Sequence, residues 1–490
     1  GEFEAAARLA RAQLAAGHDS RIAPLIGLAD SAAAGAFGDI LALPQSEGTL
    51  GALLEGLVRG WAAHGLGRVE AALDTFESTA KATAMGAFVQ YHRALALAAA
   101  GDYERAEAEF AASENGFLQQ SRRGLVARAQ VLSQLDRAAD ARALLADAFA
   151  PDDPEIAALI ARLDAGQGLP FTMIGAAGDG VAEVFFNAAS AFDRDGAEGF
   201  SLLLARLAQH LAPGRADIRL MVAEFLEGQG RYGLAADVYA SVPADDPAFY
   251  AAEMGRAGAL ARGGEGARAA EVLAELAANF PEVAAVHIAH GDMLRRLDRF
   301  NAASRAYDRA LALLGPPDPS HWALYYARGI THEREKRWPE AEADFRTALD
   351  LSPDQPEVLN YLGYSLVEMQ IKLDEALDMI ERAVAARPED GYIVDSLGWV
   401  FYRLGRYDEA VVQMERAAEL MPVDPIVNDH LGDVYWAVGR KLEARFQWRR
   451  ALSFEPEEPE AERIRRKLEI GLDAVLAEEG APPLHPRNGG

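Results

Sequence analysis

The chain has 490 residues, half of them hydrophobic and a quarter charged, which is enough apolar material for a large folded protein and excludes a wholly disordered one. The 48 Lys and Arg against 75 Asp and Glu give a net charge of −27, which disfavours nucleic acid and anionic membrane surfaces as partners. Cysteine is absent, so disulfides, thiolate metal sites and a cysteine nucleophile are excluded. The sequence contains no apolar run of 18 residues, and we expect no direct membrane insertion.

The first third of the chain predicts a loose array of helix pairs. Small residues recur there at intervals of 33 to 35 residues, at Gly27, Gly60, Ala94 and Ala129. A fixed period of this size is typical of stacked helical repeats. We therefore expect an N-terminal divergent array over residues 1–165. The residues from Gly1 onward resemble the turn that opens a second helix elsewhere in the chain, which predicts that the sequence begins in mid-unit.

A break in the period separates this array from the next one. The small positions Ala129 and Ala189 are 60 residues apart, about one period plus an insertion. The inserted residues are rich in Gly, which favours irregular backbone. We expect a linker over residues 166–180.

The pattern Gly228-x-Gly230-x-x-Gly233 matches a dinucleotide-binding loop by letter. Such a loop requires a strand before it and a helix after it, whereas the flanking residues here both have helical patterns. The glycines are interpreted as a turn between two helices, and no cofactor is expected.

The C-terminal half carries the strongest periodicity. Four pairs of residues are each separated by 34 positions: Gly398 and Gly432, Ala410 and Ala444, Ala417 and Ala451, and Pro422 and Pro456. Upstream, the same small position is occupied by Ala189, Ala223, Gly258, Gly291, Gly329 and Gly363. These spacings predict an array over residues 181–458 and about twelve units in the whole chain. A charged amphipathic helix at 459–480 is expected to cap the last unit, and 481–490 to form a disordered tail.

This repeat resembles the tetratricopeptide repeat, an antiparallel pair of helices, A and B, with the pattern W-x2-L-G-x2-Y…A-x3-F…P. Leu397 and Gly398 are followed by Phe401, and Ala410 by Met414. The resemblance implies an all-α solenoid, a right-handed superhelix of helix pairs. The residues from Asp395 to Trp436 also resemble large tetratricopeptide proteins of alphaproteobacteria, many of which are exported.

No catalytic or metal-binding motif stands out. His287 and His290 could share a helical face, but no further ligands accompany them. We interpret both as polar side chains of the surface or groove and not as metal ligands. His332-Glu333 lacks the second histidine of a zinc-protease motif, and no G-x-S-x-G is present. We expect no enzyme activity, no metal and no cofactor.

The resemblance implies a concave groove lined by the A helices through repeat positions 2, 5, 9, 12 and 13. A peptide-binding strip of aromatic and polar residues is expected there, comprising Tyr326, Asn360, Tyr364, Asp395, Trp399, Tyr402, Arg403, Asp429, Asp433 and Trp436. Relatives that clamp a C-terminal carboxylate use Lys and Asn in this groove. The acidic residues here would repel such a ligand, and a neutral or basic peptide is expected instead.

The sequence therefore predicts a non-catalytic scaffold that binds a protein or peptide, with a role in bacterial envelope assembly implied by the resemblance. Self-association is open. The alternative is an accessory, substrate-recruiting region of an enzyme such as a glycosyltransferase, whose catalytic part lies outside this sequence. The resemblance favours a periplasmic or outer-membrane-associated location if a signal was removed, with the cytoplasm as the alternative.

Overall fold

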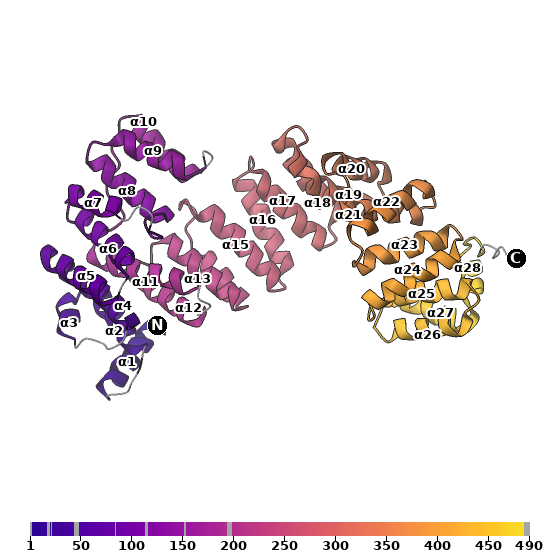
Figure 1. Ribbon diagram of the computed structural model, residues 1–490, viewed down its shortest axis with the longest axis horizontal. Helices are drawn as coiled ribbons and strands as arrows, with labels where there is room; N and C mark the ends of the chain where they lie inside the picture. Colours follow the sequence, from indigo (N-terminus) through magenta and orange to yellow (C-terminus); the bar gives the residue numbers. More distant parts are fainter. Residues whose placement is uncertain are drawn as a thin grey trace. The chain divides into compact units, whose positions relative to one another are not determined.

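The computed structural model describes residues 2–16, 20, 22–43, 49–83, 85–112, 116–150, 153–193 and 198–484. Every regular element in these ranges is a helix, and the ranges hold no strand (Figure 1). The predicted all-α architecture of helix pairs is therefore confirmed. Within the same ranges, no helix combines the length and apolar composition needed to cross a bilayer.

The chain divides into two compact units, Gly1–Leu276 and Ala277–Gly490, and α16 (Gly266–Asn279) contains the boundary. The helices of the first unit before α16 are α1 (Glu2–Ala15), α2 (Ala23–Ala33), α3 (Phe37–Ala42), α4 (Thr49–Gly65), α5 (Val69–Thr83), α6 (Gly86–Ala99), α7 (Tyr103–Ala112), α8 (Arg122–Gln134), α9 (Ala138–Ala148), α10 (Pro154–Asp164), α11 (Ala177–Asp193), α12 (Glu198–Leu211), α13 (Ala216–Gly228), α14 (Tyr232–Tyr239) and α15 (Phe249–Arg262).

The helices of the second unit after α16 are α17 (Ala284–Arg296), α18 (Phe300–Leu314), the short 3-10 helix η1 (Pro319–His321), α19 (Trp322–Arg334), α20 (Trp338–Leu351), α21 (Pro356–Glu368), α22 (Leu373–Ala386), α23 (Gly391–Arg403), α24 (Tyr407–Leu420), α25 (Pro425–Ala437), α26 (Lys441–Leu452), α27 (Glu458–Ile470) and α28 (Leu472–Glu478).

Consecutive helices pack as A–B pairs, such as α4 with α5 and α23 with α24. In several units the small residue lies where the A helix meets its B helix, whereas a Cβ atom at Gly258 would meet only Arg262 of its own helix, at 3.9 Å. A Cβ atom at Gly60 would lie 2.2 Å from the Phe76 ring, and one at Gly398 would lie 2.7 Å from the Met414 side chain. Glycine is required at these positions because the two helices approach too closely for any larger side chain.

The turns inside and between the pairs have defined chemistry. Gly405 and Gly439 follow A helices with φ angles of 73° and 86°, which glycine adopts without strain. Asp390 begins α23 by accepting hydrogen bonds from the backbone N–H groups of Tyr392 and Ile393. Each unit is therefore bounded by residues that the sequence supplies at the repeat period.

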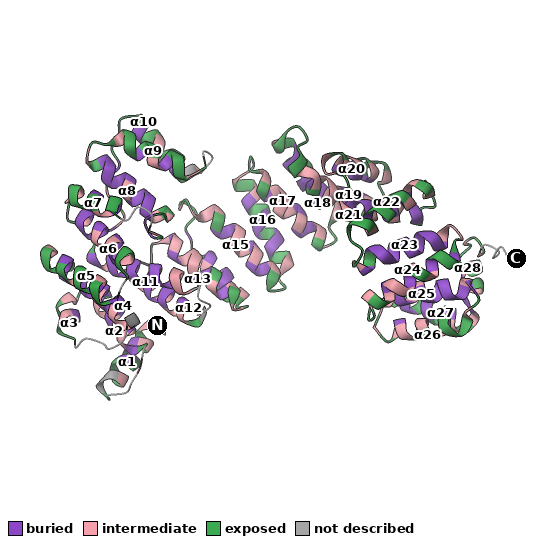
Figure 2. Cartoon of the chain, viewed as in Figure 1, coloured by how far each residue is buried: buried purple, intermediate pink, exposed green. Residues whose placement is uncertain are grey.

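Buried side chains lie where neighbouring helices face one another (Figure 2). In the second unit they form one continuous core that runs from Ala341 to Leu472. No single helix pair closes this core, because each pair buries its apolar surface against the next pair.

The segment after the last repeat forms two helices, α27 and α28, where a single helix over 459–480 was expected. Gly471 separates them with a φ of 86°, and it sits against the Trp436 ring, 2.7 Å from where a Cβ would lie. The close approach of the ring and the left-handed backbone both require glycine at this position. Residues 485–490 of the predicted tail lie outside the described residues.

Candidate binding groove

A groove in the second unit is lined by the A helices α19, α21, α23 and α25 and by α27. It consists of two adjoining pockets of about 430 and 420 Å³. The pockets share four residues, Tyr364, Glu368, Ile426 and His430. We call this surface the second-unit groove. Its volume and its mixture of apolar and polar side chains are typical of ligand sites.

The repeat period places the lining residues on one side of the unit. The fifth, sixth and ninth positions of successive A helices contribute Asn360, Tyr361 and Tyr364 from α21, Asp395, Ser396 and Trp399 from α23, and Asp429 and His430 from α25. Positions three and four apart share a helix face, and stacking repeats this face at each unit.

Aromatic stacking fixes the centre of the groove. The Trp399 ring stacks on His430 at 4.1 Å between centroids and on Tyr402 at 4.8 Å, with an interplanar angle of 17° in both cases. The Trp399 Nε1 donates a hydrogen bond of 2.6 Å to Glu368. Trp399 is therefore held in one orientation before any ligand arrives, which lowers the entropy cost of binding.

His430 forms an ion pair with Asp395, and its Nδ1 lies 2.9 Å from Oδ2 of the carboxylate. Burial lowers the pKa of His430, but Asp395, together with the nearby carboxylates of Asp429 and Asp433, outweighs burial, and the net shift is upward. The pair places a charged imidazole beside Trp399 when His430 is protonated.

The carboxylates of Asp429 and Asp433 are paired within the chain. The ammonium group of Lys467, fully buried on α27, lies 2.7 Å from Asp429 and 2.7 Å from Asp433. Burial raises the pKa of Asp429 on balance, although Lys467 lowers it. The negative charge expected at this end of the groove is therefore largely neutralised by the chain itself.

Six of the residues predicted for the peptide-binding strip line the groove: Asn360, Tyr364, Asp395, Trp399, Arg403 and Asp429. The other four do not line either pocket. Tyr402 is buried behind Trp399, and Tyr326 packs between Phe345 and Tyr361. Asp433 accepts a hydrogen bond of 2.9 Å from the indole of Trp448.

Trp436, the last of these four, is covered by the cap that follows the repeats. Its Nε1 donates a hydrogen bond of 2.9 Å to Asp473 on α28.

His430, Ile426 and Tyr392 line the groove without having been singled out in the sequence. His430 occupies the sixth position of its unit, as Tyr361 and Ser396 do in theirs. Ile426 and Tyr392 occupy the second position, which the resemblance did assign to the groove. The sixth position was not among those expected to line the groove, so His430 was missed. The repeat alignment alone would have found Ile426 and Tyr392.

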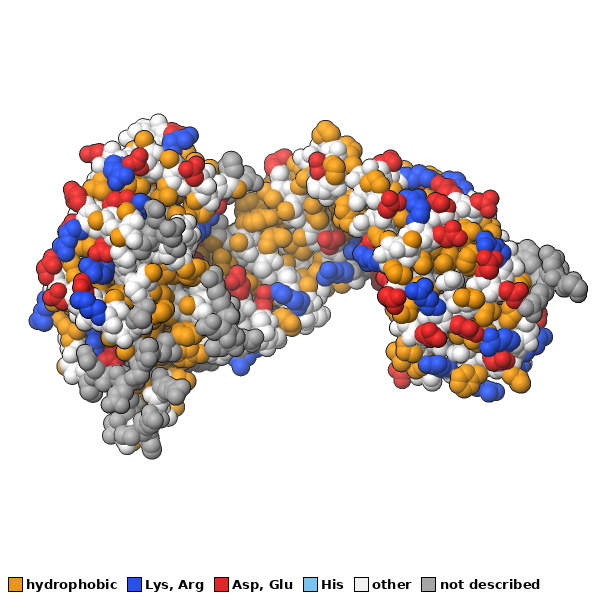
Figure 3. Space-filling model, viewed as in Figure 1, with side chains coloured by type: hydrophobic (Ala, Val, Ile, Leu, Met, Phe, Trp, Pro, Cys, Tyr) orange, Lys and Arg blue, Asp and Glu red, His pale blue; other side chains and the backbone are white. Residues whose placement is uncertain are grey.

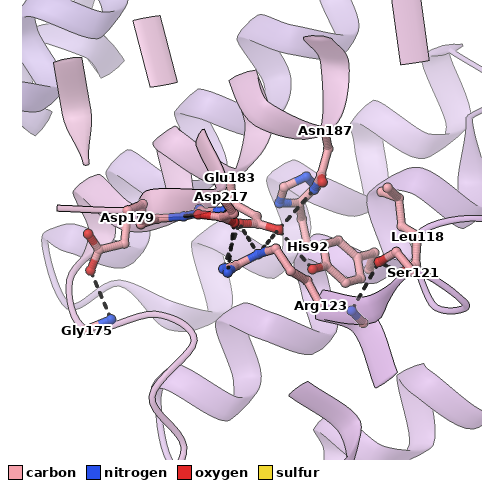
Figure 4. Close-up of polar contacts among 12 residues, drawn as sticks. His92, Leu118, Ser121, Arg123, Gly175, Asp179, Glu183, Asn187 and Asp217 are labelled. Carbon is pink, nitrogen blue, oxygen red and sulfur yellow. Dashed lines mark hydrogen bonds and ion pairs between the residues drawn. The ribbon is translucent and has the colours of Figure 1, made fainter. Parts of the chain in front are cut away.

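The equivalent face of the first unit is covered by α11, which packs on α4 and α6. We number the repeat so that the small residue of each unit is position 8. In this numbering Trp61 is at position 9, Tyr91 at position 5, His92 at position 6 and Arg123 at position 2. All four surround α11, as Figure 4 shows for His92 and Arg123 beside Glu183. We call this face the first-unit groove.

Glu183 of α11 is the central group of the first-unit groove and is fully buried. It accepts hydrogen bonds from Tyr91 at 2.9 Å, Arg123 at 3.1 Å and Arg215 at 2.7 Å (Figure 4). Burial raises the pKa of Glu183, but the two guanidinium groups lower the pKa by more than burial raises it. The net shift is downward, and the carboxylate stays charged. Removing either the carboxylate or the arginines would leave buried charge without a partner.

His92 lies beside this cluster and is also fully buried. Its Nδ1 accepts a hydrogen bond of 3.2 Å from the Trp61 indole, and its Nε2 has no hydrogen-bond partner in the part of the chain that the structure describes. Burial lowers the pKa of His92 to about 4. The imidazole is therefore neutral at pH 7.

The predicted linker at 166–180 is bound to groove positions 9, 12 and 13 of α8. The Leu169 N–H donates to Ser133 at 2.8 Å, and its C=O accepts from Gln134 at 2.7 Å. The Thr172 N–H donates to the Gln130 side chain at 2.9 Å. The Leu169 side chain is buried in the core of α8 and α9. A non-helical segment of this chain is thus held along an A helix through backbone hydrogen bonds and one apolar side chain.

Within the described residues, no group of three or more His, Asp or Glu side chains is placed to hold a metal ion. His287 instead contacts the C=O of Pro281 through Nε2 at 3.0 Å.

Comparison with known families identifies the repeat. The family described as tetratricopeptide repeat matches residues 288–356 and 365–425. A TPR repeat-containing protein of Pseudomonas aeruginosa is 29% identical over 174 residues, which cover 35% of this chain and 28% of that protein. The chain thus spans less than a third of the length of the curated relative it matches.

Two solved structures resemble the chain over most of its length. The Cut9–Hcn1 hetero-tetramer of the APC/C covers 93% of this chain and 97% of its own, with 13% identity and a TM-score of 0.42. Yeast Tom70 covers 87% of this chain and 98% of its own, with 15% identity and a TM-score of 0.38.

Proposed function

We propose that this tetratricopeptide repeat protein is a non-catalytic scaffold that binds an extended peptide segment of a partner protein in the second-unit groove. The observation that carries the proposal is the difference between the two grooves. In the first unit the groove positions hold parts of the same chain, whereas in the second unit the same positions line two open pockets.

The hydrogen bonds between α8 and residues 169–172 support the proposal that the ligand is an extended peptide. Side-chain amides and a hydroxyl of the A helix form hydrogen bonds with the backbone N–H and C=O groups of that segment, and the Leu169 side chain packs in the core. In the second-unit groove, Asn360 lines the larger pocket and offers an equivalent group, because its Oδ1 has no hydrogen-bond partner among the described residues. A peptide N–H donating to this oxygen would remove the cost of leaving it unpaired.

The charges of the second-unit groove favour a neutral or basic peptide. The larger pocket is lined by the carboxylates of Glu333, Glu368 and Asp395 and by the side chains of Arg334 and His430. Asp395 is paired with His430 and Glu368 with Arg403, but the Glu368 carboxylate is about half exposed and faces both pockets. A Lys or Arg side chain next to an apolar residue would contact Glu368 while its neighbour packs on Tyr364 and Trp399.

The test is a titration of the full chain with fluorescent extended peptides that share apolar residues and differ in flanking Lys, Gln or Glu. Lys- or Gln-flanked peptides are expected to bind, and Ile426→Ser is expected to weaken binding about tenfold. Val412→Ser is the matched control, because both residues are exposed aliphatic side chains and only Ile426 lines the groove. Binding that prefers the Glu-flanked peptide, or equal loss in both variants, would refute the proposal.

We extend the proposal to the place of action, the bacterial envelope, because the residues from Asp395 to Trp436 resemble exported tetratricopeptide proteins. Fractionation of cells that express the natural protein at its native level tests this. Recovery from the periplasmic or outer-membrane fraction is expected, and recovery from the cytoplasm alone would contradict it.

A further inference from the structure

Helix α26 differs in charge from the three B helices directly before it, although α18 also carries more Arg than Asp or Glu. In α20, α22 and α24, four carboxylates accompany one arginine in each helix. In α26 the ratio is reversed, with Lys441, Arg445, Arg449 and Arg450 accompanying the single Glu443. Three of these cations have contacts within the fold: Lys441 lies over the Trp436 ring, and Arg445 and Arg450 donate hydrogen bonds to the C=O groups of Leu468 and Pro422.

The same helix carries the Leu and the Phe side chain with the highest exposed fractions among the leucines and phenylalanines of the described residues. Leu442 is 83% exposed and Phe446 is 62% exposed. They are four residues apart and therefore neighbours on one helix face, and exposed Arg449 continues that face. We call Leu442, Phe446 and Arg449 the α26 stripe.

The opposite face of α26 already satisfies the needs of the fold. Ala444, Trp448 and Ala451 are fully buried, and the Trp448 ring fills the space over Gly432 of α25. The α26 stripe lines neither pocket of the second-unit groove. Figure 3 shows hydrophobic side chains beside basic ones over this helix. Adjacent exposed apolar side chains rimmed by charge mark interaction surfaces.

We propose that the α26 stripe is a second interaction surface, which binds an amphipathic helix of another protein whose apolar face is flanked by Asp and Glu. Leu442 and Phe446 supply apolar contacts at helical spacing. Arg449 is exposed, and it supplies the cation for a partner carboxylate.

A helix suits the α26 stripe better than a membrane or a second copy. An anionic bilayer is flat and would also meet the acidic surface of a chain with a net charge of −27. A second copy carries the same net charge and would be repelled at long range. A single acidic helix is small enough to contact the basic face alone.

The test uses the full chain carrying Ile426→Ser, which weakens the second-unit groove, and two labelled peptides of roughly 18 residues, five helical turns. Both carry the same Leu and Phe stripe, one flanked by Glu and the other by Lys. Fluorescence anisotropy is expected to show about tenfold tighter binding of the Glu-flanked peptide, with a preference that shrinks in high salt.

The variant Leu442→Ser/Phe446→Ser is expected to lose about tenfold in affinity for the Glu-flanked peptide. Val412→Ser/Val423→Ser is the matched control, since both valines are exposed in the second unit outside α26. Ile426→Ser should also bind this peptide normally, which separates the α26 stripe from the second-unit groove. Equal binding of the two peptides, or no loss in the α26 variant, would overturn the proposal.

Two further outcomes would also overturn it. A concentration-dependent dimer in sedimentation velocity that Leu442→Ser/Phe446→Ser abolishes would assign the stripe to a second copy. Co-sedimentation with phosphatidylglycerol vesicles that the same variant abolishes would assign it to a membrane.

Discussion

The two units use the same repeat positions for opposite purposes. In the first unit, groove positions 2, 5, 6 and 9 surround Glu183 of α11, and α8 holds the segment around Leu169. In the second unit, the corresponding positions line two open pockets. The repeat therefore determines where a groove forms, and the side chains at a few positions determine whether the chain fills it or leaves it open.

The largest expected effect concerns Glu183. Glu183→Ala leaves Arg123 and Arg215 without their buried carboxylate, and we expect a loss of about 4 kcal/mol in unfolding free energy of the first unit. Chemical denaturation monitored by hydrogen exchange of α4 and α6 measures it. The control Glu368→Gln changes a half-exposed carboxylate and should cost less than about 1 kcal/mol. Equal effects of the two variants would contradict the buried, charged role of Glu183.

A pH effect of intermediate size should come from His92. Its pKa is lowered to about 4 by burial, so the folded chain binds fewer protons than the unfolded chain between that value and the ordinary 6.5. Stability therefore falls as the pH drops through this window, by roughly 3 kcal/mol in total. His92→Gln, which keeps an acceptor for Trp61, should remove this part of the acid dependence. An unchanged pH profile of stability in His92→Gln would rule it out.

A smaller effect is expected where the first unit holds its own non-helical segment. Ser133→Ala removes the acceptor of the Leu169 N–H and should cost about 1 kcal/mol locally. Limited proteolysis should then cleave residues 166–176 faster, whereas Ser78→Ala, at an exposed serine of α5, should not change the rate. If both variants are cleaved at the rate of the parent chain, the hydrogen bond to Leu169 does not hold the segment.

The smallest effect should come from the His430–Asp395 pair of the second unit. The pKa of His430 is raised in the folded chain, so the stabilisation is present below the ordinary value of 6.5 and is lost as the pH rises through the raised folded value. Burial of the ring offsets much of the attraction, which keeps the effect small. Asp395→Asn should lower the His430 pKa in an NMR titration, and a pKa that stays in place would show that Asp395 does not hold the proton.

The fold was predictable because its signals are local and repeated. Gly398, Ala410 and Pro422 recur at a fixed spacing, and each has a physical reason to be there. The groove residues at positions 5 and 9 of α21 and α23 followed from the resemblance to tetratricopeptide repeats, once the spacing had aligned the units.

The remaining features depend on contacts that no period encodes. Glu183 meets Tyr91 across 92 residues of sequence, so the filling of the first-unit groove could not be inferred from the repeat. Asp433 and Trp436 were assigned to the groove because their positions fit. In the structure, Lys467 and Asp473 from the helices after the last repeat bind them, and these helices lie outside the repeating pattern.

The central claim is that the second-unit groove binds a peptide and the first-unit groove does not. Hydrogen–deuterium exchange of the full chain, with and without a saturating Lys-flanked peptide, tests it most directly. Slower exchange in α21, α23 and α25, with no change in α4, α6 and α8, is the expected result. Protection of α4, α6 and α8, or of no A helix at all, would contradict the claim.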